Sequence, residues 1–298
     1  MLISNSARRK LARRSLNGLS VGDAFGQQFV SQPELLGRRE LPMFPWTFTD
    51  DTVMGIAVTQ TLEICGEVNQ DDLAQRFGTM YAEDPHRGYG DTAHMILRAI
   101  ASGAPWREVS SRAFGGSGSM GNGAAMRAAP VGAWFFDDPQ QAAKQAVLNA
   151  EVTHMHIDGQ AGAVAVAVAA ALACQWQIEG MAESKRSALM ETVLPFVPDS
   201  VTRNVLARAL ELPDEISFQE AAAELGNGEQ ITSQDTVPFC LWSAQECLLN
   251  YTEAMWQTAS VFGDIDTNCA IVGSIVSLAS GDGCIPEEWM LSREPLIG

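Results

Sequence analysis

The stretch Gly162-Ala-Val-Ala-Val-Ala-Val-Ala-Ala-Ala-Leu-Ala173 decides the fold class. It presents an apolar surface on every side of a helix, and a helix of that kind is buried in a protein core. A second stretch, Ala270-Ile-Val-Gly-Ser-Ile-Val-Ser-Leu-Ala-Ser-Gly281, has the same character. Small side chains let helix axes approach closely, so we expect both stretches to form central, closely packed helices.

Helical periodicity also dominates the sequence around these two stretches. In the segment that follows Thr52, the residues Val53, Ile56, Ala57 and Ile64 fall on one helical face. Further helices are expected over residues 71–81, 139–150, 159–177, 184–194, 198–210, 252–260 and 269–280. Strand-like alternation is scarce and β-branched runs are short, so the sequence predicts an all-α protein.

No proline- or serine-rich linker separates these periodic segments. We therefore predict a single compact helical domain over residues 1–298, with its core at about 15–283. The more polar stretch of residues 178–234 is expected at the periphery.

Composition and charge narrow the class of function. The chain has 298 residues, of which 46% are apolar and 18% are charged, and this composition excludes general disorder. The 36 acidic and 19 basic residues give a net charge of −17, which repels phosphates and excludes general nucleic-acid binding. An anionic substrate would need a bound cation or a local positive site.

The sequence also gives expectations about the compartment. No apolar run reaches about 18 residues, since the one at 161–174 is too short, and no secretory signal is visible. The basic stretch 6–16 has features of a transit peptide, but an amphipathic first helix is the favoured interpretation. The six cysteines are scattered and predict buried, reduced thiols: Cys65, Cys174, Cys240, Cys247, Cys269 and Cys284. We expect a cytoplasmic monomer that does not associate with membranes.

The first motif with chemical potential is Thr49-Asp50-Asp51-Thr52, at the start of an expected helix. Helix capping is one explanation, because a Thr or Asp at the N-cap and acids in the first turn stabilise a helix. Capping needs only one acid, however, and adjacent carboxylates repel each other unless a cation lies between them. Such hard oxygen ligands suit Mg²⁺, Mn²⁺ or Ca²⁺, so a metal site and a cap both stay open.

The second motif, Gly263-Asp-Ile-Asp-Thr-Asn268, repeats this chemistry before the other apolar helix. In an extended lead-in, the i, i+2 spacing places Asp264 and Asp266 on the same side, and Thr267 adds a hydroxyl at the helix start. Capping is again the alternative. If the two helix N-termini converge, four carboxylates and two hydroxyls would surround one cavity, an arrangement that favours two divalent cations.

The third motif is the glycine-rich segment Phe114-Gly-Gly-Ser-Gly-Ser-Met-Gly-Asn-Gly-Ala-Ala-Met-Arg127. Its glycines expose backbone N–H groups before an expected helix start at Ala124, and such a loop can cradle a diphosphate. It lacks the Gly-Lys-Ser/Thr ending of a P-loop and follows no strand, so neither a P-loop nor a Rossmann fold is supported. A flexible loop is the alternative.

Two shorter segments complete the candidate residues. In Thr153-His-Met-His-Ile-Asp158, a third His or a Cys ligand for zinc is missing, so His154 is interpreted either as a phosphate donor or as a packed side chain. In the loop Pro85-His-Arg-Gly-Tyr-Gly-Asp-Thr92, Tyr89 and Asp91 are assigned to the substrate-binding set, with a solvated turn as the alternative.

Taken in order, these motifs resemble those of the ADP-ribosylglycohydrolase family, which includes the dinitrogenase reductase-activating glycohydrolases. The resemblance extends from about residue 15 to 283. It rests on Gly18-Leu-Ser-Val-Gly-Asp-Ala-Phe-Gly26, Phe48-Thr-Asp-Asp-Thr52, Gly121-Asn-Gly-Ala-Ala-Met-Arg127 with Ala129-Pro130, Thr153-His154, and Gly263-Asp-Ile-Asp-Thr267.

The resemblance implies a compact all-α domain with a binuclear Mg²⁺ or Mn²⁺ site, in which the two acidic motifs meet. By position, the metal ligands of the family fall on Thr49, Asp50, Asp51, Asp264, Asp266 and Thr267. Its diphosphate-contacting loop falls on Gly118, Ser119, Met120 and Gly121, with Asn122 beside it, and its phosphate-side histidine falls on His154.

The implied function is a metal-dependent hydrolase that cleaves the N- or O-glycosidic bond between ADP-ribose and a modified protein or small molecule. Asp50 or Asp51 would orient the attacking water or carry a proton, and Asp266 completes the expected catalytic set. The alternative is a non-catalytic relative that binds ADP-ribose or has a structural role. A third reading is a phosphatase or nucleotide hydrolase that uses the same metal pair.

One position departs from the family pattern. Many members carry a Glu eight residues after the first glycine of the Gly-Asp-Ala-x-Gly motif, but this chain has Val30 there and its nearest acid is Glu34. The departure argues against the serine-linked specificity of the family and leaves the general acid or base unnamed. The acceptor side is expected to be lined by residues 27–43 and 89–94.

Overall fold

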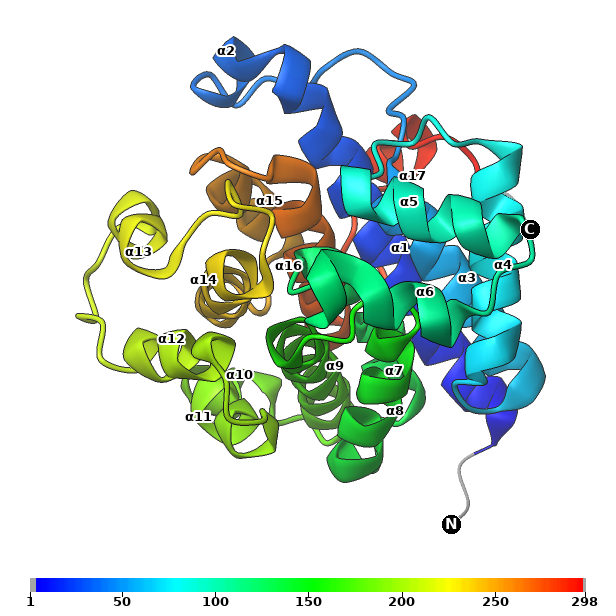
Figure 1. Ribbon diagram of the computed structural model, residues 1–298. Helices are drawn as coiled ribbons and strands as arrows, with labels where there is room; N and C mark the ends of the chain where they lie inside the picture. Colours follow the sequence, from blue (N-terminus) through cyan, green and yellow to red (C-terminus); the bar gives the residue numbers. More distant parts are fainter. Residues whose placement is uncertain (1–3, 297–298) are drawn as a thin grey trace.

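The computed structural model describes residues 4–296 as a series of helices, and over that range the only β pairings are two isolated bridges. The all-α prediction is therefore confirmed (Figure 1). The α-helices are α1 (Asn5–Ser31), α2 (Pro33–Leu36), α3 (Asp50–Cys65), α4 (Gln70–Glu83), α5 (Asp91–Ala101), α6 (Trp106–Arg112), α7 (Ala129–Trp134), α8 (Pro139–Glu151), α9 (Ile157–Ile178), α10 (Ala182–Lys185), α11 (Leu189–Val193), α12 (Val201–Ala209), α13 (Phe218–Leu225), α14 (Ser233–Glu246), α15 (Tyr251–Ala259), α16 (Ile265–Ser280) and α17 (Glu287–Ser292). Short 3₁₀ turns lie at η1 (Ala113–Gly116), η2 (Asn122–Ala124), η3 (Arg186–Ala188) and η4 (Leu194–Phe196).

Helix α9 lies at the centre of the core, as its all-round apolar surface predicts. Its residues 161–174 are buried, and it packs against α7, α8, α14 and α16. A Cβ atom at Gly132 of α7 would overlap the carbonyl of Ala167, so small residues set this close helix approach. By length and hydropathy alone α9 could cross a membrane, but 89% of its most apolar window is buried inside the protein, as expected of a core helix.

The pairing of α1 with α16 brings the two ends of the chain together. Gly18, Gly22 and Gly26 are spaced four residues apart on α1 and therefore lie on one face. Cβ atoms at these positions would meet Gly273, the carbonyl of Cys269 and the backbone of Asp266, respectively. The absence of side chains along this face lets the two helix backbones touch, and it fixes the N-terminus of α16 beside Gly26, in the C-terminal part of α1.

Gly22→Ala is expected to lower the free energy of unfolding by about 3 kcal/mol, because the added methyl overlaps a backbone carbonyl that cannot move aside. Gly37→Ala is the matched control, since Gly37 has φ −61° and its Cβ would meet nothing closer than 4.0 Å. Urea unfolding of the two variants measures the difference. Equal midpoints for both would show that the α1–α16 contact tolerates a side chain.

Three helix predictions need correction at their boundaries. The expected helix at 184–194 is broken into α10, η3 and α11, and the one at 198–210 begins only after Ser200, whose side chain caps α12. Helix α16 begins at Ile265, four residues before the predicted start at 269, so Asp266 lies in its first turn and the extended lead-in is wrong. Helices α10 to α13, from the polar stretch 178–234, lie along one edge of the fold, as predicted (Figure 1).

The prediction of buried cysteines holds for only part of the set. Cys174, Cys240 and Cys269 are buried, Cys247 and Cys284 are partly buried, and Cys65 is exposed at the end of α3. All six thiols are free.

Candidate active site

The two acidic motifs meet where the N-termini of α3 and α16 converge. Thr267 Oγ1 lies 3.4 Å from Asp51 Oδ2, although 216 positions separate these residues in the sequence. A cavity of about 440 Å³ opens beside this contact, and its acidic wall consists of Asp50, Asp51, Asp264 and Asp266 together with Thr267. Thr49 is buried behind the wall and does not line the cavity.

Helix capping does not explain these motifs. Thr49 and Asp264 occupy the N-cap positions of α3 and α16, but neither side chain caps its own helix. The Thr49 hydroxyl lies 2.9 Å from Asp23 Oδ1 and 3.1 Å from Asp51 Oδ2. The polar groups at both N-termini are therefore directed toward one another and toward the cavity.

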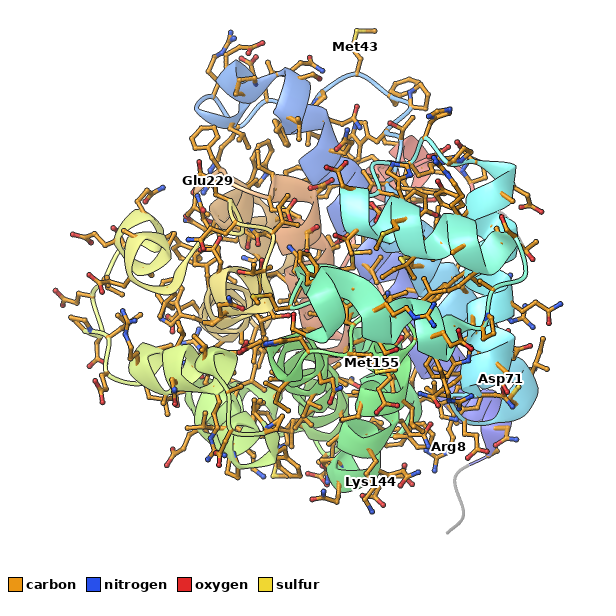
Figure 2. All side chains as sticks on the ribbon, in the orientation of Figure 1. Arg8, Met43, Asp71, Lys144, Met155 and Glu229 are labelled. Atoms are coloured by element: carbon orange, nitrogen blue, oxygen red, sulfur yellow. The ribbon has the colours of Figure 1, made fainter. Side chains whose placement is uncertain are left out.

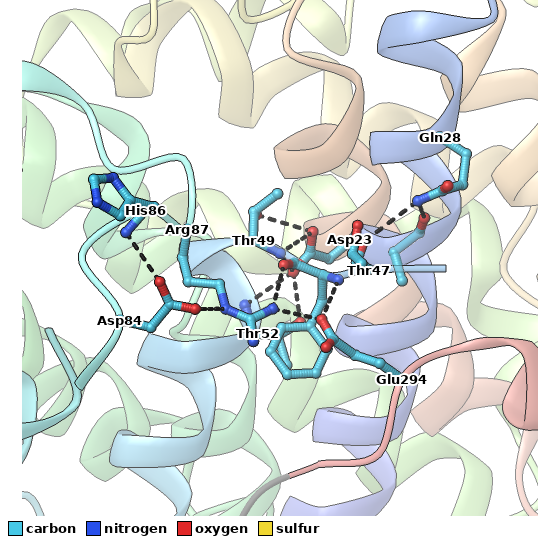
Figure 3. A network of polar contacts seen from close by, with 11 residues as sticks. Asp23, Gln28, Thr47, Thr49, Thr52, Asp84, His86, Arg87 and Glu294 are labelled. Carbon is cyan, nitrogen blue, oxygen red and sulfur yellow. Dashed lines mark hydrogen bonds and ion pairs between the residues drawn. The ribbon is translucent and has the colours of Figure 1, made fainter. Parts of the chain in front are cut away.

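Asp23 of α1 is the buried carboxylate that the sequence interpretation missed. It accepts hydrogen bonds from the backbone N–H groups of Thr49 and Thr52, at 3.0–3.1 Å, and from both hydroxyls (Figure 3). Asp23 thus supplies from a neighbouring helix the cap that α3 lacks. The sequence does contain a signal for this role. Asp23 stands between Gly22 and Ala24 in a close-packed helix, where a carboxylate has no path to solvent and therefore needs polar partners inside the protein.

The carboxylates of the acidic cluster, Asp23, Asp50, Asp51, Asp264 and Asp266, lie close enough to repel one another. Burial, with the charge of Asp266 as the second cause, raises the pKa of Asp23 to about 7 and that of Asp264 to about 8. Burial and neighbouring carboxylates raise the pKa of Asp50 and of Asp51 well above the ordinary value. None of the ion pairs within residues 4–296 includes a member of the cluster.

The glycine-rich segment forms the wall next to the acidic cluster. Ser119, Met120, Gly121 and Asn122 line the cavity, whereas Gly118 lies outside its lining. Asn122 Nδ2 donates to Asp264 Oδ2 at 2.7 Å, which ties this segment to α16. The expected helix start at Ala124 is wrong: the chain makes the 3₁₀ turn η2 there, and α7 begins only at Ala129.

His154 lies against the same glycines. Cβ atoms at Gly121 and Gly123 would each come within 3.1 Å of its ring, and the ring lines the cavity. Burial, reinforced by the charge of Arg127, lowers the pKa of His154 to about 3, so the imidazole is neutral at physiological pH. His156 Nδ1 instead accepts from the N–H of Asp158 and caps α9, so the two histidines have separate roles.

The loop before α5 separates the two residues that we assigned to substrate binding. Asp91 lines the cavity. Tyr89 is buried away from the lining, with its ring 5.2 Å from that of Tyr81 and 5.8 Å from that of His94, so the geometry gives no support for substrate contact. The loop is anchored at Arg87, whose carbonyl accepts from the N–H of Asp50 at 2.7 Å and whose guanidinium pairs with Asp84 and Glu294 (Figure 3).

Of the two segments that were expected to line the acceptor side, only one lines the cavity. Residues 88 and 90–93 line the cavity, whereas no residue of 27–43 is among those that line it in the described part of the chain. Val30, which stands where the family often has a Glu, is 59% exposed. Met43 points away from the helices (Figure 2).

An all-α fold with acidic helix termini and a glycine-rich wall around one cavity agrees with the features that the motifs predict for a glycohydrolase of the ADP-ribosylglycohydrolase type. The chain belongs to the ADP-ribosylglycohydrolase family, whose model matches residues 4–295. It is 31% identical to the human ADP-ribosylhydrolase ARH3 over 278 residues, covering 83% of this chain and 74% of that protein. The chicken protein of the same name is 29% identical, with 95% and 88% covered.

Two further comparisons agree with this assignment. The ADP-ribosyl-[dinitrogen reductase] glycohydrolase of Rhodospirillum rubrum is 28% identical over 151 residues, which cover 47% of this chain and 49% of that enzyme. A solved structure described as an ADP-ribosylglycohydrolase-related protein complex superposes with a TM-score of 0.65 at 23% identity, over 97% of this chain and 94% of the other. This structural likeness shows the fold.

Proposed function

We propose that this protein hydrolyses the glycosidic bond between ADP-ribose and a modified acceptor, and that it uses two Mg²⁺ or Mn²⁺ ions for this reaction. Family membership supports the bond class. The observation that carries the metal proposal is the approach of Thr267 to Asp51, which gathers buried and partly buried carboxylates from two distant parts of the chain without a basic side chain paired to them among residues 4–296.

The residues fit divalent cations by the chemistry of their donors. Asp51 Oδ1 is buried without a hydrogen-bond partner, and a carboxylate oxygen is a hard donor of the kind these cations prefer. Within residues 4–296, no three Asp, Glu, His or Cys side chains are placed so that they alone could hold a metal ion. The proposed ligand set comprises Thr49, Asp50, Asp51, Asp264, Asp266 and Thr267. Thr49 does not line the cavity, but its hydroxyl lies 3.1 Å from Asp51 Oδ2 and so next to the other proposed ligands. Cations bound there would supply Lewis-acid stabilisation of ribose oxygens and of the attacking water.

The glycine-rich wall would hold the diphosphate. The Ser119 hydroxyl, which accepts from the N–H of Gly121, and the neutral ring of His154 both line the cavity and have a polar hydrogen to donate. This placement puts the anionic part of ADP-ribose beside hydrogen-bond donors and the distal ribose beside the carboxylates. A cavity of about 440 Å³ lies within the range of small-molecule sites.

The remaining chemistry falls to the carboxylates on the cavity surface. The bond from the anomeric carbon to the acceptor would break with oxocarbenium character. Asp50, which lines the cavity at the start of α3, would orient the water and accept its proton, with Asp51 as the alternative base. The leaving acceptor atom takes up one proton, so the products are free ADP-ribose and the unmodified acceptor.

The test is hydrolysis of peptides ADP-ribosylated on arginine or on serine, with Mg²⁺ or with EDTA. We expect release of free ADP-ribose with Mg²⁺ and a loss of at least about a hundredfold in rate with EDTA, because without the cations nothing would activate the attacking water or bind the ribose oxygens as a Lewis acid. Chromatography identifies the products. ADP-ribose binding without release from either linkage would favour a non-catalytic binding protein, and release of AMP or phosphate would favour a nucleotide hydrolase.

A further inference from the structure

We propose that Arg127 and Thr153 form a positioning relay that fixes His154 in its Nε2–H tautomer, so that a neutral ring presents one N–H donor to the bound diphosphate. The identity of the ligand rests on the proposed function. The tautomer itself depends only on the protein.

Arg127 is the buried end of the relay. Its side chain is fully buried with no carboxylate within ion-pair distance among residues 4–296, and its guanidinium is occupied by neutral acceptors. Nε donates to Asn149 Oδ1 at 3.1 Å, Nη1 donates to the carbonyl of Gly123 at 3.1 Å, and Nη2 donates to the Asn149 carbonyl and to Thr153 Oγ1, both at 2.9 Å. The guanidinium also stacks at 4.6 Å on the Phe77 ring.

The bond from Arg127 determines the direction of the next hydrogen bond. An arginine can only donate, so Thr153 Oγ1 must accept from it. The same oxygen lies 2.7 Å from His154 Nδ1. Arg127 and His154 are its only hydrogen-bond partners in the described part of the chain. If Nδ1 carried the proton, the buried Thr153 hydroxyl hydrogen would have no protein acceptor among residues 4–296, which is costly. The satisfied arrangement has Thr153 donating to Nδ1, so the ring proton resides on Nε2.

The Nε2 side of the ring is the side that a ligand can reach. No hydrogen bond to Nε2 exists among residues 4–296, and the ring lines the cavity. Gly121 and Gly123 lie against Nε2 and Cε1, where a Cβ atom would come within 3.1 Å. Glycine at these two positions therefore keeps the donor uncovered, and Arg127 Nη1 holds the Gly123 carbonyl in the same network.

The relay also keeps the ring neutral. Burial is the main cause of the lowered pKa of His154, and the charge of the buried Arg127 guanidinium lowers it further. A neutral imidazole in the Nε2–H form still donates to a phosphate oxygen, and it does so without titrating near neutral pH. A ring without a fixed tautomer would present a lone pair to the phosphate part of the time, and that lone pair repels phosphate oxygens.

The experiment is ¹⁵N NMR of the full chain labelled at histidine, with long-range proton–nitrogen correlation. His154→Gln assigns the signals, because the other histidines, His86, His94 and His156, remain. In the wild type we expect Nε2 to be protonated and Nδ1 unprotonated. In Thr153→Val, which preserves the shape but removes the hydroxyl, we expect the Nε2–H preference to be lost. Thr153→Ser, the matched control, keeps the hydroxyl and should keep the tautomer.

Binding of ADP-ribose, measured by calorimetry, provides the second readout. We expect Thr153→Val to weaken binding by about tenfold and Thr153→Ser by less than about threefold. A protonated Nδ1 in the wild type, or an unchanged tautomer in Thr153→Val, would overturn the relay. If the tautomer behaves as expected but no ADP-ribosylated substrate is hydrolysed, the relay stands and only the proposed function fails.

Discussion

Asp266→Asn is expected to reduce turnover of an ADP-ribosylated substrate by a factor of about a hundred to a thousand and to weaken Mn²⁺ binding. Asp266 lies in the first turn of α16 and lines the cavity, and its charge contributes to the raised pKa values of Asp23, Asp50 and Asp264. The amide has nearly the same shape but is a weaker ligand without charge. Initial rates and calorimetric titration with Mn²⁺ measure the two effects.

Asp282→Asn is the control for this variant. Asp282 lies just beyond the other end of the same helix, where it pairs with Lys10 and Arg14 on the surface. Removing its charge changes the net charge of the chain by the same amount without touching the cluster, so turnover and Mn²⁺ binding should stay at the wild-type level. Undiminished turnover in Asp266→Asn would refute the role of this carboxylate.

The second large effect concerns stability, pH and metal. Between about pH 4 and pH 8 the metal-free folded state should bind more protons than the unfolded chain, because the pKa of Asp23 is raised to about 7 and that of Asp264 to about 8, above an unfolded value of about 3.9. The sign is therefore fixed: stability falls as pH rises through this range. The metal-free protein should melt at a higher temperature at pH 5.5 than at pH 8.

Saturating Mg²⁺ or Mn²⁺ should reverse this trend. At pH 8 a cation at about a hundred times its Kd would stabilise the folded state by about 2.7 kcal/mol, which for a chain of 298 residues corresponds to a rise in Tm of roughly 4 °C. At pH 5.5 protons compete for the same oxygens, so the rise should be smaller. Differential scanning fluorimetry with and without EDTA measures both. An equal Tm with and without metal at pH 8 would contradict the proposed cation site.

The sequence was sufficient for the parts of the fold that local periodicity controls. Residues 162–173 and 270–281 are apolar on all sides, and both lie in core helices. The start of α16 could not be found in this way, because the charged residues of 264–268 hide the helical period. The boundaries at 184–194 likewise depend on tertiary packing, which can override weak local propensities.

The site was only partly predictable from the sequence, because it is assembled from residues that lie far apart along the chain. That the two acidic motifs meet was implied by the family resemblance and not by the residues themselves, since 216 positions separate Asp51 from Thr267. Asp23 was missed because its partners, the N–H groups of α3, come from another helix. Tyr89 was assigned from its proximity in sequence to Asp91, but the chain turns its ring into the core.

The most direct test of the central claim is a crystal structure of the protein with Mn²⁺, with anomalous diffraction data used to locate the ions. The acidic side chains of α3 and α16 are proposed to share a pair of cations. We therefore expect two anomalous peaks between residues 49–51 and residues 264–267, within bonding distance of their side-chain oxygens. Well-ordered crystals grown in millimolar Mn²⁺ that show no anomalous peak at these residues would contradict the account.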